Sequence, residues 1–297
     1  MLWGLQSFQV KEQQKSMSNT SKRISAAFTL LAAAGVLPLA AAAQAVTLAP
    51  HRAVYDVTLD RSSPGSGVAE MTGRMVYELT GSACEGYTQN MRFVTRSSGS
   101  EGASRINDLR TSSWEETGGK RLRFSTTQYQ DDVLAETSQG DAGRDGKGIK
   151  VELSKPAEKA LKLPGDVYFP IQHSIALIEA ARARKLQFAA DLYDGSEKGE
   201  KVYTTNSVIG RPFAPGAAKV PASVKNAEKL DALPSWPIAI SYFEPGAEKK
   251  DAVPAYELGF RFFDNGVSTG LRIDYGEFAI RGEIKELVFL EASKCAP

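Results

Sequence analysis

The side chains best suited to acid–base or metal chemistry are scarce in this sequence. Histidine occurs only twice, as His51 and His173, so a site with several histidine ligands cannot be built from one chain. The sequence contains neither the Gly-x-Ser-x-Gly motif of α/β-hydrolases nor the His-Glu-x-x-His motif of zinc proteases. His173 lies between Ile171 and Ile175, where a hydrogen-bonded packing role is more usual than that of a catalytic base. We expect no catalytic residues and no cofactor.

One acidic segment has the length of a calcium-binding loop. Residues 141–152 read DAGRDGKGIKVE, and clustered carboxylates are the ligands that hard cations prefer. However, Gly143 and Gly148 occupy the loop positions where an oxygen ligand and a hydrophobic residue belong, and the flanking residues alternate as strands do. The segment therefore predicts a Gly/Asp-rich hairpin loop, and we expect no metal site.

The only two cysteines are Cys84 and Cys295. In an oxidising compartment two such residues normally pair, and here they would close nearly the whole domain. The alternative is one reactive thiol and one inert thiol. Neither cysteine belongs to a Cys-x-x-Cys motif or has a basic cluster beside it, so the sequence favours a disulfide.

The N-terminal segment has the features of a secretory signal peptide. Lys22 and Arg23 precede an apolar stretch, residues 24–43, which leads into the small-x-small sequence Ala43-Gln44-Ala45. We expect cleavage after Ala45 and export to an oxidising compartment outside the cytoplasm. The alternative, a membrane anchor, is disfavoured because the stretch is rich in alanine and only marginally long enough to span a bilayer.

Two predictions follow for the rest of the chain. Residues 1–16 form an N-terminal extension that precedes a more usual signal start at Met17, so two translation starts stay open, Met1 and Met17. Residues 46–297 form a single domain. The sequence has 36 Lys and Arg against 35 Asp and Glu, and this balance argues against binding to nucleic acid or simple attachment to an anionic membrane.

Most of the chain shows the period-2 alternation of β-strands, bounded by Gly, Ser, Asp or Asn. The sequence Asp264-Asn265-Gly266 is typical of a hairpin turn. The pattern predicts a mainly β protein with antiparallel strands. The predicted strands are 51–59, 71–80, 87–96, 105–115, 121–129, 133–138, 238–243, 256–263, 270–275, 277–283 and 286–291.

A single segment, residues 170–185, predicts a long α-helix. Ile171, Ile175 and Ile178 recur at helical spacing and should face the sheet, and Pro170 suits the first turn. Cationic side chains gather at the C-terminal end, where the helix dipole favours them. These are Arg182, Arg184 and Lys185.

Four aromatic or heteroaromatic residues are candidates for lining a groove that takes an acyl chain or a peptide. They are Trp114, Phe169, His173 and Trp236. The alternative is that they pack in the core of a large sheet.

Several ordered segments of the sequence resemble the cell-envelope integrity protein B (EipB) family. They are residues 48–59, 73–95, 169–182, 191–210 and 290–295. The resemblance implies a periplasmic protein with a β-spiral fold, in which antiparallel strands wind into an open, bent, barrel-like sheet around a helix. It also implies that Cys84 pairs with Cys295, that the protein supports envelope integrity, and that no enzymatic activity is established.

These observations together predict a non-enzymatic periplasmic factor. We expect it to act as a monomer and to bind an envelope lipid, a lipoprotein or another periplasmic protein. Two alternatives stay open. The protein could be a scaffold that binds other proteins through exposed strand edges, or a hydrolase acting on envelope polymers, which would need a pair of facing acids.

Overall fold

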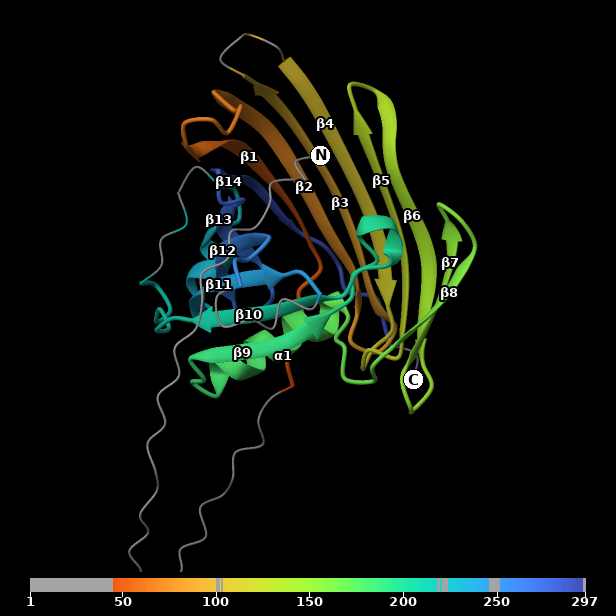
Figure 1. Ribbon diagram of the computed structural model, residues 1–297. Coiled ribbons are helices and arrows are strands. Elements are labelled where there is room, and N and C mark those ends of the chain that lie inside the picture. Colours follow the sequence, from red (N-terminus) through yellow and green to blue (C-terminus); the bar gives the residue numbers. More distant parts are fainter. Residues whose placement is uncertain are drawn as a thin grey trace, which may run out of the picture. The chain divides into compact units, whose positions relative to one another are not determined.

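The alternating segments fold into one 14-stranded antiparallel sheet, which a computed structural model places around a helix (Figure 1). The structure describes residues 45–99, 102, 104–217, 220, 224–245 and 252–295. The predicted extension and signal peptide, up to residue 44, lie outside the described residues. The described residues belong to one compact unit.

Strands that are neighbours in the sheet follow each other in the sequence, except at its centre. There β1, the first strand, pairs with β14, the last. One half of the sheet contains β1 (His51–Ser62), β2 (Glu70–Ser82), β3 (Gly86–Ser98), β4 (Ser104–Glu115), β5 (Arg121–Gln130), β6 (Val133–Arg144), β7 (Ile149–Lys155) and β8 (Lys159–Leu163). The other half contains β9 (Gln187–Leu192), β10 (Tyr203–Ile209), β11 (Ser235–Phe243), β12 (Tyr256–Phe263), β13 (Ser268–Asp274) and β14 (Phe278–Phe289).

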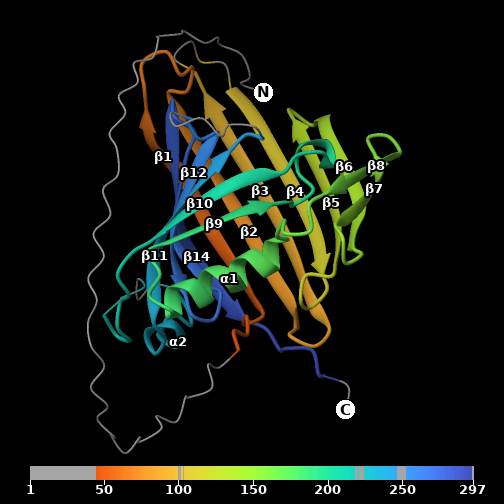
Figure 2. The same ribbon diagram turned by 60° about the horizontal axis from the view of Figure 1, so that its bottom comes forward.

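The sheet does not close into a barrel. Its two edges are β8 and β9, and these strands do not pair with each other. Figures 1 and 2 show that the strands twist and that the sheet bends around the space that holds the helix. The prediction of a mainly β fold with an open, bent sheet and one long helix is confirmed.

The predicted alternation places apolar side chains on the inner face of the sheet. In β5, Leu122 and Phe124 are buried whereas Arg121 and Arg123 are exposed. This pattern explains why most strands could be located, because one face is covered and the other is solvated.

Two details of the predicted strands are wrong. The sequence predicts separate strands at 277–283 and 286–291, whereas one strand, β14, spans Phe278–Phe289. A β-bulge explains the error: Tyr55 pairs with Ile284 and Val54 pairs with Glu286, so Lys285 is an extra residue that reverses the alternation. The sequence pattern also gave no bounds for β7 and no indication of β8, β9 and β10.

The helix α1 spans Pro170–Arg182 and lies inside the bend of the sheet (Figure 2). It is shorter than the predicted 170–185, because Arg184 adopts a left-handed conformation with φ of 58° that ends it. Ile171 and Ile178 are buried, and Ile175 is partly buried against the same apolar cluster. The rest of that cluster includes Leu79, Tyr87, Ile209, Trp236, Ile238, Ile240, Tyr242 and Phe262. A 3₁₀ turn, η1 (Glu197–Gly199), and a short helix, α2 (Glu228–Asp231), complete the fold.

The acidic segment 141–152 forms the hairpin between β6 and β7, as predicted. At its turn, Asp145 Oδ1 accepts hydrogen bonds from the backbone N–H groups of Lys147 and Gly148, both at 3.1 Å. Asp141 and Glu152 lie on the strands, and each forms an ion pair with a cationic side chain. The carboxylates thus stabilise the hairpin and its strands.

None of the helices in the described part of the chain is long and apolar enough to cross a membrane.

Candidate functional site

The N-terminus of α1 is capped by a side chain from a distant strand. The N-cap residue, Phe169, has no side-chain oxygen, and the cap comes instead from Glu115 at the end of β4. Glu115 Oε2 accepts a hydrogen bond from Ile171 N at 2.7 Å, and Oε1 accepts one from Gln172 N at 2.8 Å. The carboxyl group thereby satisfies two N–H groups that an α-helix leaves unpaired and lies at the positive end of its dipole.

Arg144 stabilises the segment that precedes the helix through hydrogen bonds. From β6 it donates hydrogen bonds to the carbonyl oxygens of Gly119 at 3.1 Å and Val167 at 3.0 Å, and to that of Gly165. Its guanidinium lies 5.4 Å from the centre of the Phe169 ring, which is fully buried. Glu115 and Arg144 together fix where α1 begins relative to the sheet.

The Glu115 side chain is in a low-dielectric position. The residue is only 2 % exposed, and burial raises the pKa of its carboxyl group to about 7. The two backbone hydrogen bonds and the nearby Arg144 favour the ionised form, but they only partly offset the cost of burying the charge.

His173 lies on the buried side of α1 and is neutral at neutral pH. Its Nε2 lies 3.3 Å from Thr205 Oγ1, and that hydroxyl donates its own proton to Ala190 O at 2.7 Å. The hydroxyl oxygen therefore accepts, and the imidazole carries its proton on Nε2. The rings of Tyr168 and Phe188 surround His173, and burial lowers its pKa to about 4. This environment suits packing better than base catalysis.

A groove opens at the other end of the helix, with a volume of about 350 Å³. The C-terminal end of α1, the start of β9 and the end of β10 form its sides, and Trp236 of β11 contributes to its floor. Trp236 is itself buried, and Leu186 is 71 % exposed. The lining consists of Ala181, Arg184, Lys185, Leu186, Ile209, Gly210, Arg211, Pro212 and Trp236.

The four predicted groove residues do not gather at one place. Phe169 and His173 lie on the N-terminal half of α1, with both side chains buried, whereas Trp236 lines the groove at the opposite end. Trp114 precedes Glu115 on β4 and so points to the other face of the sheet, where the Arg123 guanidinium lies 5.8 Å from its ring centre. Only Trp236 therefore lines the described groove.

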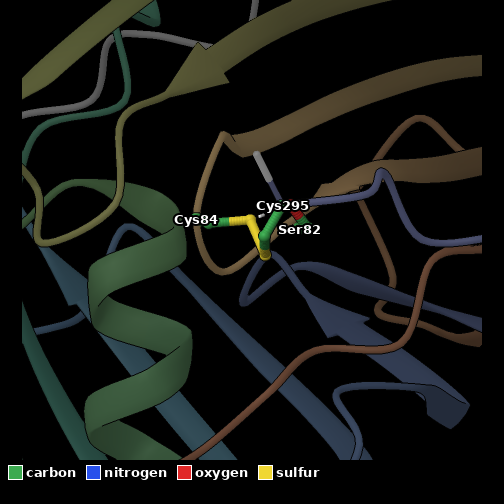
Figure 3. Close-up of a disulfide and its surroundings, with 3 residues drawn as sticks. All are labelled: Ser82, Cys84 and Cys295. Atoms are coloured by element: carbon green, nitrogen blue, oxygen red, sulfur yellow. Dashed lines mark hydrogen bonds between the residues drawn. A yellow bond between two sulfur atoms is a disulfide. The ribbon is translucent and has the colours of Figure 1, made fainter. Parts of the chain in front are cut away.

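The two cysteines form a disulfide, as predicted. Cys84 lies in the turn between β2 and β3, and Cys295 lies in the tail after β14; their Cα atoms are 5.7 Å apart (Figure 3). Ser82 Oγ is 3.1 Å from Cys84 Sγ. The tail is also held by backbone hydrogen bonds: Leu290 N donates to the carbonyl oxygen of Pro50, just before β1, and Ser293 N donates to that of Gly81, near the end of β2. The bond therefore closes the central region, where β1 meets β14.

Comparison with known proteins identifies the family. The model of the EipB-like family matches residues 42–291 of this chain. The chain belongs to the EipB-like family. Over 263 residues it is 41 % identical to the cell envelope integrity protein EipB of Brucella abortus (strain 2308), an alignment that covers 88 % of this chain and 91 % of the relative.

A solved structure supports the EipB-like fold. The crystal structure described as a β-barrel-like protein of a domain of unknown function, from Brucella abortus, superposes with a TM-score of 0.76. It is 38 % identical, and the match covers 83 % of this chain and all of that chain. The open antiparallel sheet of this chain thus matches the fold of that β-barrel-like protein.

Sequence reasoning missed the residues that position the EipB-like helix and shape its groove. Glu115 and Arg144 act on a segment far along the chain, so no local pattern reveals them. Arg184 was recognised only as one of several cations at the end of a helix, and Arg211 was not recognised. The sequence holds no signal for the role of Arg184, because arginine is an ordinary helix-forming residue and the left-handed position after a helix is usually occupied by glycine.

Proposed function

We propose that this EipB-like protein is a non-enzymatic periplasmic factor that supports the integrity of the cell envelope by binding an envelope lipid, lipoprotein or protein. The single observation that carries the proposal is the 41 % identity, over nearly the whole chain, to a protein named for cell envelope integrity.

The disulfide supports the location. Disulfides form and persist in oxidising compartments such as the bacterial periplasm and are rare in the cytosol. The Cys84–Cys295 bond joins residues 211 positions apart, and a bond of this kind fits a protein that folds in such a compartment. Export through a signal peptide cleaved after Ala45 would deliver the chain there.

The roles of the ionisable groups support binding rather than catalysis. Glu115 is a buried carboxyl with a raised pKa, which is a property of many catalytic acids. However, both of its oxygens accept hydrogen bonds from the helix N-terminus. His173 is neutral and enclosed by aromatic rings. Each group has a structural task, and this argues against the hydrolase alternative.

A scaffold that uses strand edges is the second candidate, and the open sheet favours it. The edges are β8 and β9. Yet β8 presents Lys159 and Lys162, and charged lysines on an edge oppose the addition of another strand. At the end of β9, Tyr168 N donates a hydrogen bond of 2.7 Å to Asp191 O, so this part of the strand edge already has a backbone partner. Both features reduce the edge available to a partner.

Deletion of the gene tests the envelope role. We expect the deletion strain to become more sensitive to detergents and to antibiotics that act on the cell wall, and a plasmid copy to restore resistance. A deletion strain with unchanged sensitivity to both would overturn the envelope role for this protein.

A further inference from the structure

We infer that the groove at the C-terminal end of α1 binds the anionic phosphate headgroup and the adjoining acyl chain of a phospholipid. This inference rests on the proposed function, because it specifies which envelope ligand is bound and where. It follows from the charge, the polarity and the backbone conformation of the groove.

The charge of the lining is entirely positive. Arg184, Lys185 and Arg211 contribute cations, and no acidic side chain lines the groove. Within the described ranges of the chain, these three cations form no ion pair with another side chain. Arginine is especially suited to phosphate, because its planar guanidinium can donate two parallel hydrogen bonds.

The remaining lining favours an acyl chain over a peptide. Apart from the backbone of Gly210, the other lining residues are apolar: Ala181, Leu186, Ile209, Pro212 and Trp236. The N–H of Gly210 already donates to Pro237 O at 2.8 Å. A bound peptide would leave its amide groups without partners on such a floor, which is costly, whereas an acyl chain has no hydrogen-bonding groups to satisfy.

Arg184 ends α1 in a backbone conformation that favours glycine. Lys185 N donates to Ala180 O at 2.9 Å and Arg184 N donates to Ala181 O at 3.0 Å, and these two bonds define a Schellman motif. Arg184 occupies its left-handed position with φ of 58°, where glycine is the usual residue because any Cβ is strained. Non-glycine residues held in such conformations cluster at ligand-binding sites.

This strained position supplies a sharp test. Replacing Arg184 with glycine removes the cation and also relieves the backbone, so Arg184→Gly should melt at the same temperature as the wild type or higher. Lys198 in η1 offers a matched control, because it is also a cation with a positive φ, 63°, and it does not line the groove. Arg211→Ser, in an exposed loop, is a second variant that does not depend on the helix end.

Binding is measured with the purified exported protein and soluble single-chain lipids below their micelle concentrations. We expect lysophosphatidylglycerol to bind. Lysophosphatidylcholine, which lacks a net negative charge, and inorganic phosphate, which lacks an acyl chain, should each bind at least about tenfold more weakly. Arg184→Gly and Arg211→Ser should each weaken lysophosphatidylglycerol binding by about tenfold to a hundredfold. Lys198→Gly should leave it unchanged.

Three results would overturn the inference: equal affinity for the two lysolipids, phosphate binding as tight as that of lysophosphatidylglycerol, or wild-type affinity in both groove variants. Displacement of the lipid by an acidic peptide at lower concentration would assign the groove to a protein ligand instead. Because these measurements use no cells, their failure is distinguishable from a failure of the deletion experiment.

Discussion

Glu115 at the end of β4 caps the helix that begins 55 residues later: its Oε2 accepts a hydrogen bond of 2.7 Å from Ile171 N. The contact joins the helix inside the bend to a strand in the N-terminal half of the sheet. The apolar side of the same helix packs on strands of the C-terminal half, including β10 and β11. The helix therefore links the two halves of an open sheet, and its placement determines the groove at its other end.

The first prediction concerns this cap. Glu115→Ala leaves two buried N–H groups unsatisfied and should lower the free energy of unfolding by about 3 kcal/mol. Glu115→Gln retains one acceptor oxygen and should cost less. Urea unfolding measures both, with Glu158→Ala, an exposed site, as the control expected to fall within about 0.5 kcal/mol of the wild type. A Glu115→Ala protein as stable as the control would contradict the capping role.

The second prediction is the pH dependence due to Glu115. Burial raises its pKa to about 7 from the ordinary value of 4.5, so the unfolded chain loses this proton before the folded protein does. The contribution of Glu115 to stability is therefore full below pH 4.5 and is lost as the pH rises through 7. The difference in unfolding free energy between the wild type and Glu115→Gln should change in this window and in this direction. A difference that is constant from pH 4.5 to 7 would refute it.

The third prediction concerns His173, whose contribution to stability depends on pH in the opposite direction to that of Glu115. Burial lowers its pKa from 6.5 to about 4, so the unfolded chain takes up this proton first on acidification. The contribution of His173 to the free energy of unfolding is present above pH 6.5 and is lost as the pH falls through 4. The total loss of stability is about 3 kcal/mol. His173→Gln should make stability less dependent on pH in this range. His51, whose pKa is also lowered by burial, should account for part of the dependence that remains.

The fourth prediction concerns the apolar face of α1. Ile178 is fully buried and Ile175 only partly so. Ile178→Ala should therefore cost about 2–5 kcal/mol, as is usual for a truncated core isoleucine, and Ile175→Ala should cost less. Chemical unfolding of the two variants provides the comparison. If Ile175→Ala proved the more damaging, the described orientation of the helix would be wrong.

The fifth prediction concerns the disulfide. Intact mass of the exported protein should correspond to two oxidised cysteines, and Cys84→Ser should lower stability by up to about 5 kcal/mol because the bond closes a long loop. Cys295→Ser should have the same effect, since either change removes the same bond. Thiols that react with an alkylating agent in the native protein without reductant would contradict this prediction.

The sequence allowed the fold to be predicted wherever burial differs between the two faces of a strand. β12 matches its predicted bounds because its ends are set by clear turn signals, including the Asp264-Asn265-Gly266 turn. The alternation fails at Lys285, where a bulge reverses its phase and makes β14 resemble two strands. The predicted helix is longer than the observed one because Arg184, an ordinary helix-forming residue, adopts a conformation that is usual for glycine.

The candidate site was much less predictable, for a different physical reason. The disulfide could be predicted because two cysteines allow only one intramolecular pairing. The cap by Glu115 and the groove around Trp236 depend on which strands become neighbours of the helix, and composition and periodicity do not determine that. The aromatic side chains attracted attention by type alone, although Phe169 and His173 serve to pack the helix.

The most direct test of the central claim, that the protein acts by binding an envelope ligand, is to purify it from the periplasm without detergent and identify co-purifying molecules by mass spectrometry. We expect a reproducible anionic phospholipid in the wild-type protein and in Lys198→Gly, and its loss from Arg184→Gly. A wild-type protein that carries no lipid, and instead retains one protein partner in every preparation, would contradict the lipid-binding account.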